Sequence, residues 1–290
     1  MKEKMLFVLA LAPVFCCCAV KESSTLFHTR FSLRSEAPAK RVELMVFRAG
    51  DGGLDARVCG EGVSSLDADV SRGLELNWYL FANLPEGLLD GVSRESQLRN
   101  LTIGSQAASS ESEAMHASGS LVAEAGMPPL QASLLRYGCM ISLDSIFVRY
   151  AGAFAERPPC VLKEARLVNV PAAMPLSGDA PAGGWTSESQ ALQEEIPSEG
   201  LLAGLSFYCL PNPLSEGEVA ALALRVEIGT QSYWYSVFFP SMRGNTHYAV
   251  RRVDILGAGA PEPGQEPGRE GIEYSVDVLE WSEEDKTLEF

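Results

Sequence analysis

The chain has 290 residues, of which 46% are hydrophobic and 21% are charged. This length suits about two folded domains and argues against a disordered chain or a miniature scaffold. The 38 acidic residues outnumber the 23 Lys and Arg residues, and the formal charge of −15 repels phosphate backbones and anionic lipid headgroups. Because the sequence has three His and no basic tract, we expect neither nucleic-acid binding nor a multi-His metal centre.

The N-terminus has the pattern of an export signal. Lys2 and Lys4 precede an uncharged run over Met5–Val20, which Pro13 interrupts. About 16 residues at 1.5 Å each reach about 24 Å, which is short of the roughly 30 Å hydrocarbon core of a membrane. We therefore expect this segment to be removed rather than to span a membrane.

Three consecutive cysteines, Cys16, Cys17 and Cys18, follow the apolar run. A lipoprotein signal peptidase requires a Cys whose thiol carries diacylglycerol, with an aliphatic residue at −3 and a small one at −1. Cys17 fits best, with Val14 and Cys16 in those places, and Cys18 is second. The sequence thus predicts a lipoprotein signal peptide over residues 1–17 and anchoring in the outer membrane through acyl chains. The alternative is that these cysteines are apolar residues of an ordinary signal.

The remaining chain alternates apolar and polar residues in short runs separated by turn residues, as antiparallel sheets do. In Phe27–Arg34, one face carries Phe27, Thr29, Phe31 and Leu33, and the other carries basic and polar residues. Further strands are expected at Val42–Phe47, Leu74–Ala82, Leu98–Ile103, Ala132–Ile141, Ser145–Tyr150, Val161–Val170, Gly204–Cys209, Val219–Ile228, Tyr233–Phe239, Tyr248–Leu256 and Ile272–Trp281.

Two segments break this series. The Ser-rich stretch Gly104–Gly119 is predicted to be an exposed loop, and Gly257–Gly271 a solvated connector. Met127–Pro129 ends any strand, so a domain boundary is expected near residue 130. No helical period is sustained over three turns. The sequence therefore predicts an all-β fold with two Greek-key, transthyretin-like β-sandwich domains in tandem, over residues 18–130 and 131–290.

Four cysteines lie beyond the signal: Cys59, Cys139, Cys160 and Cys209. Their number allows two disulfides in an oxidising compartment, but three lie in apolar stretches where buried thiols fit equally well. Whether they pair is left open. Their spacing gives no zinc or redox motif.

Catalytic motifs are not found in the sequence. His28, His116 and His247 are far apart, and neither a G-x-S-x-G elbow nor an H-E-x-x-H pair occurs. We expect no enzymatic activity, no catalytic residue, no metal and no cofactor. A hydrolase with dispersed carboxylates remains an alternative, because 38 acidic residues could hide a pair.

The mature chain resembles the fimbrillins of Bacteroidales type V pili and their accessory and anchor relatives. The resemblance rests on the order of several short segments rather than on any one of them. These are Val42–Phe47 with Ala49–Gly52, Asn77–Pro85, Ala165–Pro171, Phe207–Leu214, Tyr233–Tyr235, Arg243–Tyr248, Gly257–Pro263 and a closing strand that ends in Trp281.

The resemblance implies a subunit of a cell-surface fimbrium, exported as a lipoprotein and trimmed after an Arg by a trypsin-like protease. Trimming would remove the first strand, residues 26–34, whose inward residues Phe27, Thr29, Phe31 and Leu33 would act as a plug. Arg41 is the preferred cleavage position and Arg34 the second. An extended segment of another subunit would then fill the groove by β-strand addition.

The candidate donor is the C-terminal strand, through Ile272, Tyr274, Val276, Val278, Leu288 and Phe290. The same strand could equally complete its own sandwich. Alternatives are a lipidated, uncut anchor subunit and a glycan-binding surface lipoprotein. The partners expected are other fimbrial subunits, the outer membrane and a host protein or glycan. Whether the subunit belongs to stalk, tip or anchor is left open.

Overall fold

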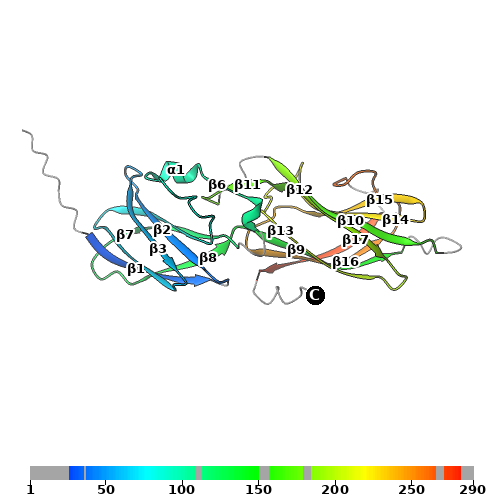
Figure 1. Ribbon diagram of the computed structural model, residues 1–290, viewed down its shortest axis with the longest axis horizontal. Coiled ribbons are helices and arrows are strands. Elements are labelled where there is room, and N and C mark those ends of the chain that lie inside the picture. The colour runs from blue at the N-terminus through cyan, green and yellow to red at the C-terminus, as the bar shows by residue number, and fades with distance from the viewer. Residues whose placement is uncertain are drawn as a thin grey trace, which may run out of the picture.

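The computed structural model describes residues 26–35, 37–108, 113–149, 157–178, 184–265 and 271–281. The predicted signal peptide, Cys17, Cys18, Leu288 and Phe290 lie outside these ranges. Two bodies built almost entirely of strands lie end to end, with the N-terminal body at the left of Figure 1. Within the described ranges, no helix has the length and apolar character needed to cross a membrane.

The elements follow one another along the chain with few helical residues between them. The first body contains β1 (Leu26–Ser35), β2 (Arg41–Arg48), β3 (Leu54–Glu61), β4 (Ser65–Ser71), β5 (Glu75–Ala82), α1 (Glu95–Arg99), β6 (Thr102–Gly104), the short 3-10 helix η1 (Ser105–Ala108), β7 (Met115–Val122) and β8 (Leu130–Arg136). The second contains β9 (Cys139–Val148), β10 (Cys160–Pro171), β11 (Ala173–Pro175), β12 (Trp185–Glu195), β13 (Leu201–Cys209), β14 (Ala220–Ile228), β15 (Gln231–Phe239), β16 (Thr246–Ile255) and β17 (Ile272–Glu280).

The N-terminal sandwich is one folded-over sheet in the order β3-β2-β5-β7-β8-β1-β4. Its two layers meet at β7 and β8, which share only the pairs Met115–Arg136 and His116–Leu135. Side chains from both layers, such as Leu44, Leu66 and Trp78, form one buried cluster between them. The alternation of apolar and polar residues thus places each strand's apolar face on a common core.

The C-terminal sandwich has two separate sheets, β12-β10-β14-β15 and β13-β9-β16-β17. Its neighbours pair antiparallel except β9 and β16, which run parallel. A second cluster, which includes Ile141, Leu224 and Val250, fills the space between these sheets. The all-β fold with two sandwiches in tandem, expected from the sequence, is confirmed.

The two bodies are joined by a third buried cluster and by a small sheet. β6 of the first body pairs with β11 of the second. The Tyr137 hydroxyl donates a hydrogen bond of 2.6 Å to the carbonyl of Leu176, and both residues belong to the cluster that also contains Phe47 and Leu210. The bodies therefore share a packed apolar junction rather than a bare linker.

Several local predictions differ from the structure. The Gly104–Gly119 stretch is not a continuous loop, because Met115–Val122 forms β7. Gly119 lies opposite Trp78, and a Cβ there would come within 2.7 Å of the indole ring, so the strand needs a residue without one. Leu98–Ile103 is a strand only in its last two residues, which belong to β6, because Leu98 and Arg99 end α1. The Gln97 side chain accepts hydrogen bonds from the amides of Ser93 and Arg94 and so closes the first turn of that helix.

The position at which the chain passes from the first sandwich to the second also differs from the predicted boundary. Residue 130, where we expected the boundary, is the first residue of β8, and β8 belongs to the N-terminal sheet. The predicted strand Ala132–Ile141 is two strands, β8 and β9, divided at Tyr137 and Gly138. The turn between them therefore marks the passage from the first body to the second.

Candidate functional site

The first described strand, β1, lies inside the N-terminal sheet and not at its edge. It pairs antiparallel with β4, from Leu26 opposite Ser71 to Ser32 opposite Ser65. On its other side it pairs parallel with β8, where Phe31 is opposite Leu130. The two neighbours of β1 are not paired with each other, so β1 alone links β4 to β8 in this sheet. β1 therefore pairs through its backbone with a different strand on each side.

The inward face of β1 is inserted into the core of the N-terminal sandwich. Phe31 is fully buried, and its ring meets Trp78 edge to face with centroids 5.7 Å apart. Thr29 is also buried, while Phe27 and Leu33 are partly buried and pack against the same cluster. The four residues that sequence alternation selected thus share one face and one set of neighbours.

The outward face of β1 places Arg30 and His28 opposite carboxylates of β4. The Arg30 guanidinium donates two hydrogen bonds to Asp67, of 2.8 and 3.1 Å, and a His28 ring nitrogen lies 2.9 Å from Asp69. The hydrogen bonds from Arg30 hold the pKa of Asp67 below its ordinary value. Because these pairs are exposed, they add little to stability, and their main effect is to favour this alignment of β1 against β4.

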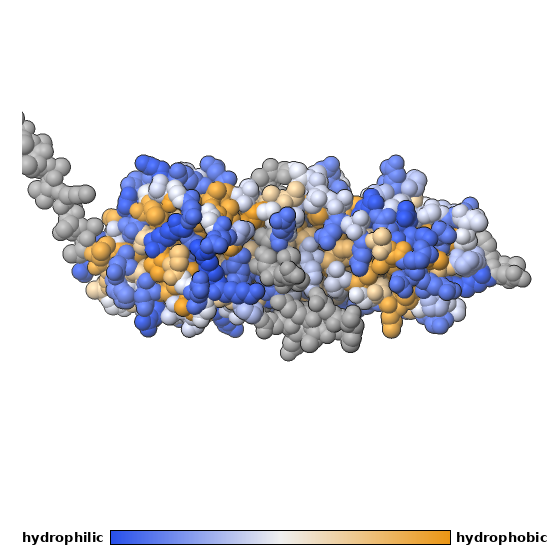
Figure 2. Space-filling model, in the orientation of Figure 1, coloured by the Kyte–Doolittle hydropathy of each residue, from blue (hydrophilic) through white to orange (hydrophobic). Residues whose placement is uncertain are grey.

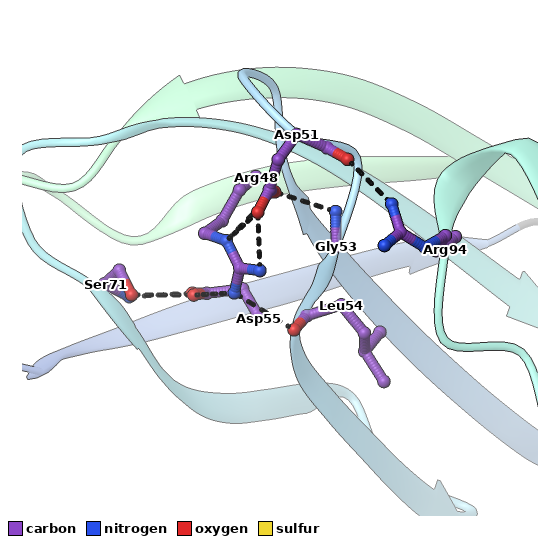
Figure 3. A network of polar contacts seen from close by, with 7 residues as sticks. All are labelled: Arg48, Asp51, Gly53, Leu54, Asp55, Ser71 and Arg94. Atoms are coloured by element: carbon purple, nitrogen blue, oxygen red, sulfur yellow. Dashed lines mark hydrogen bonds and ion pairs between the residues drawn. The ribbon is translucent and has the colours of Figure 1, made fainter.

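β4 has attachments that do not depend on β1. Asp55 on β3 accepts a hydrogen bond of 2.7 Å from the amide of Ser71 and another of 2.6 Å from its hydroxyl (Figure 3). The neighbouring turn is held by Arg48 and Gly53, which both donate to Asp51. The end of β4 is therefore fastened to β3 independently of β1.

The two predicted cleavage positions flank the connector from β1 to β2 and do not lie in a loop. Arg34 is exposed within β1, and Arg41 is the first residue of β2. Asn83 holds this connector: its side-chain oxygen accepts from the Lys40 amide at 2.9 Å, its side-chain nitrogen donates to Pro38, and its amide donates to the carbonyl of Arg41. Asn83 adopts a left-handed φ of 56°, which suits this bridging geometry. Both arginines therefore lie in hydrogen-bonded backbone.

The predicted donor strand β17 is an edge strand with little burial. It pairs only with β16 in its sheet. Ile272 and Val276 are partly buried against the C-terminal core, whereas Tyr274 and Val278 are 41% and 66% exposed. Detaching residues 272–280 alone would therefore expose little apolar surface.

The end of β17 is anchored by a buried contact that was not predicted from the sequence. Trp281 is 1% exposed, and the guanidinium of Arg136 lies 4.8 Å from its ring centroid. Arg136 also donates a 2.8 Å hydrogen bond to the Trp281 carbonyl and lies 3.7 Å from Glu113. A sequence clue existed, since Arg136 continues the period-2 apolar face of Ala132 and Leu134 and so indicates a buried cation with a partner.

A cavity of about 320 Å³ lies between the bodies, lined by His116, Tyr137, Met174, Met242 and Arg243, among others. The His116 ring stacks on Tyr137 with centroids 4.2 Å apart, and burial lowers its pKa to about 4. In the part of the chain that the structure describes, no three His, Cys, Asp or Glu side chains gather as a metal site would require. On the visible face, polar residues spread over both bodies with apolar patches among them (Figure 2).

No family model matches the chain, and no curated protein matches it. Solved structures do. A fimbrilin from Porphyromonas gingivalis aligns over 88% of this chain and 97% of its own, with a TM-score of 0.65 and 12% identity. A protein from Bacteroides eggerthii described as a putative cell adhesion protein aligns over 89% of this chain and 97% of its own, with a TM-score of 0.67 and 16% identity. Another so described, from Parabacteroides distasonis, aligns over 89% of this chain and 98% of its own, with a TM-score of 0.69 and 12% identity. A C-terminally truncated tip fimbrial protein from Porphyromonas gingivalis gives 0.58 at 11% identity, with 88% and 100% covered.

At these identities the comparisons establish the fold. They cover both sandwiches, because each alignment spans nearly nine-tenths of the chain. The resemblance drawn from the sequence is thereby confirmed at the level of the fold.

Proposed function

We propose that this protein is a structural subunit of a cell-surface fimbria and that it assembles by strand exchange at the β1 position. The proposal rests on the place of β1: the first described strand, flanked by the candidate cleavage residues Arg34 and Arg41, alone links β4 to β8 in its sheet. The structural likeness to a fimbrilin and to a tip fimbrial protein supports the same role, which is not enzymatic.

Removal of β1 would create the acceptor. The backbone groups of β4 and β8 that now bond to β1 would be unpaired, and Trp78 would lose its contact with Phe31. An exposed ladder with an apolar floor is a site for an extended peptide. Each large apolar side chain that refills the groove contributes about 1.5 to 3 kcal/mol. Before trimming, β1 occupies the groove and so prevents assembly.

β17 of a second subunit is the proposed donor. Its residues Ile272, Tyr274, Val276 and Val278 repeat at every second position, as the inward residues of β1 do. Between Ile272 and Glu280 its side chains are mostly exposed, so its departure costs chiefly the backbone ladder with β16 and the buried place of Trp281 beside Arg136. Leu288 and Phe290 would extend the same pattern beyond the described residues.

Export as a lipoprotein through Cys17 or Cys18 would deliver the subunit to the outer membrane, and cleavage at Arg41, or at Arg34, would release β1. A subunit that keeps its lipid and is not cut would serve as the anchor. The N-terminal residue of the protein recovered from cells separates these roles: Val42 or Ser35 marks a trimmed building block, and a lipid-blocked cysteine marks an anchor.

The test is trimming followed by assembly. The full chain is treated with a trypsin-like protease, sequenced from its new N-terminus and examined by size-exclusion chromatography. We expect cleavage after Arg41 or Arg34 and then oligomers, and we expect neither with the Arg34→Gln, Arg41→Gln double variant. Arg72→Gln, at an exposed turn, is the matched control and should behave as the wild type. Trimmed chains that stay monomeric at high concentration would contradict the proposal.

A further inference from the structure

Two buried cysteines face each other across neighbouring strands of the C-terminal sandwich. Cys139 begins β9, Cys209 ends β13, and the strand register places them directly opposite each other. Their sulfur atoms lie 3.6 Å apart, and both are free thiols in this structure. Directly opposed residues of antiparallel strands have Cα atoms about 4.5 to 5.5 Å apart, which falls within the range that a disulfide bridges.

We infer that Cys139 and Cys209 form a disulfide when this protein folds in an oxidising compartment. The bond would fasten β9, the first strand after the junction, to β13. The sulfur gap has to close from 3.6 Å to about 2 Å between two strands that are already paired in register.

The other described cysteines differ from this pair. Cys59 is exposed, and the Cys160 thiol donates to the carbonyl of Pro158 at 3.4 Å. A cross-link in this chain is therefore expected between Cys139 and Cys209, with Cys59 and Cys160 remaining thiols.

The reaction is thiol–disulfide exchange with an external disulfide as oxidant. The thiolate of one cysteine attacks the oxidant, forms a mixed disulfide and releases one thiol of the oxidant. The thiolate of the second cysteine then attacks the protein sulfur of the mixed disulfide, which closes the Cys139–Cys209 bond and releases the second thiol. Two protein thiols are thus oxidised, one external disulfide is reduced to two thiols, and the two protein protons pass to them.

The burial of Cys139 limits when the disulfide can form. Cys139 is fully buried, and burial raises the pKa of its thiol well above the ordinary value, so the folded chain holds almost no thiolate there. Exchange should therefore occur while β13 docks on β9 and should be slow once the sandwich has closed.

The bond would close a loop of 70 residues, from β9 through β10 and β12 to β13. A loop of this length restricts the unfolded chain strongly, so the linked form should melt roughly 5 to 15 °C above the reduced form. If the chain serves in a fimbria, as proposed above, the loop would also protect these strands from extension when the subunit is pulled from its ends. The pairing itself does not depend on that role.

The experiment refolds the reduced full chain in glutathione disulfide, blocks free thiols with N-ethylmaleimide in denaturant and maps peptides without reduction. We expect a linked Cys139–Cys209 peptide, maleimide adducts on Cys59 and Cys160, and far slower linkage when oxidant is added to the folded reduced chain. Cys160→Ser, the matched buried control, should keep the linkage, and Cys209→Ser should leave Cys139 as an adduct.

Recovery of Cys139 and Cys209 as adducts after oxidative refolding, or linkage of Cys139 to Cys59 or Cys160, would overturn the inference. Because the primary readout uses the wild-type chain, it does not depend on any variant folding. The same peptide mapping on protein taken from intact cells tests the compartment separately. If Cys139 and Cys209 are linked in the refolded sample but carry adducts in the cellular sample, the result counts against the surface location and not against the pairing of the two cysteines.

Discussion

Phe31 on β1 and Trp78 on β5 meet edge to face across the N-terminal core, with ring centroids 5.7 Å apart. The first described strand thus reaches the opposite layer of its sandwich, and its backbone ties together β8 and β4. This contact makes β1 part of the core even though it lies near the end of the chain.

Phe31→Ala should lower the free energy of unfolding of the N-terminal sandwich by about 3 to 5 kcal/mol, because a fully buried ring leaves a cavity against Trp78. Denaturant unfolding followed by tryptophan fluorescence measures the change. Leu26→Ala is the matched control on the same strand, since Leu26 is 65% exposed, and should shift stability by no more than about 0.5 kcal/mol. Equal effects of the two substitutions would mean that β1 is not packed in solution.

Asn83→Gly should speed proteolytic trimming at Arg41. The substitution keeps a residue that accepts the left-handed φ but removes the side-chain hydrogen bonds to Lys40 and Pro38, so the connector opens more often. Since those bonds are worth about 1 kcal/mol each, the initial cleavage rate should rise several-fold.

Asn169→Gly is the control for that measurement, because Asn169 has the same φ of 56° but lies on β10 in the other sandwich. Its cleavage rate should equal that of the wild type. An unchanged rate for Asn83→Gly would indicate that the protease acts without opening of the connector.

Acid should weaken the fold through His116. Burial lowers the pKa of this ring to about 4 in the folded chain, against 6.5 for a free histidine, so folding favours the neutral ring. The associated stability is complete above about pH 6.5 and is lost as the pH falls from there to about 4, by about 3 kcal/mol in all.

Unfolding free energy measured across this pH range should decline more steeply in the wild type than in His116→Phe, which keeps the stacking on Tyr137 without a titrating group. Parallel pH profiles for the two proteins would show that the ring is solvated in both folded and unfolded chains.

The carboxylates of β4 should influence which strand enters the groove. Asp67 and Asp69 now face Arg30 and His28, whereas the outward face of β17 carries acidic residues, Glu273 and Asp277. Replacement of β1 by β17 therefore exchanges attraction for repulsion, which salt screens. Asp67→Asn with Asp69→Asn should raise the affinity of trimmed chain for a peptide of residues 272–281 by roughly 2- to 5-fold at low salt.

Asp90→Asn, an exposed carboxylate that bonds Arg57, is the control and should leave this affinity unchanged. Calorimetric titration at two salt concentrations gives the comparison. No salt dependence in the wild type would argue that the peptide does not lie beside β4.

The sequence predicted β1, β2 and the later strands β14 to β17 well. β1 alternates between a core face and an exposed face, whereas β2 and β14 are apolar runs buried on both faces. β12 was not predicted because its side chains are mostly exposed and polar. β7 was not predicted because Gly119 and its serine neighbours are typical of a loop. Both are strands through pairing with neighbours, which no local pattern records.

The candidate site was predictable in part. The inward residues of β1 follow from sequence alternation, but its parallel pairing with β8 joins segments about a hundred residues apart in sequence and needed the structure. The Arg136–Trp281 contact and the opposed sulfur atoms of Cys139 and Cys209 likewise depend on strand register, which composition does not reveal.

The central claim is that loss of β1 opens a groove which another strand fills. Hydrogen exchange of the β4 and β8 amides, followed by mass spectrometry, tests it in three samples: the full chain, the chain trimmed at Arg41 and the assembled oligomer. We expect slow exchange in the full chain, fast exchange in the trimmed monomer and slow exchange again in the oligomer. Equally slow exchange of these amides in the trimmed monomer, or fast exchange that persists in the oligomer, would contradict the claim.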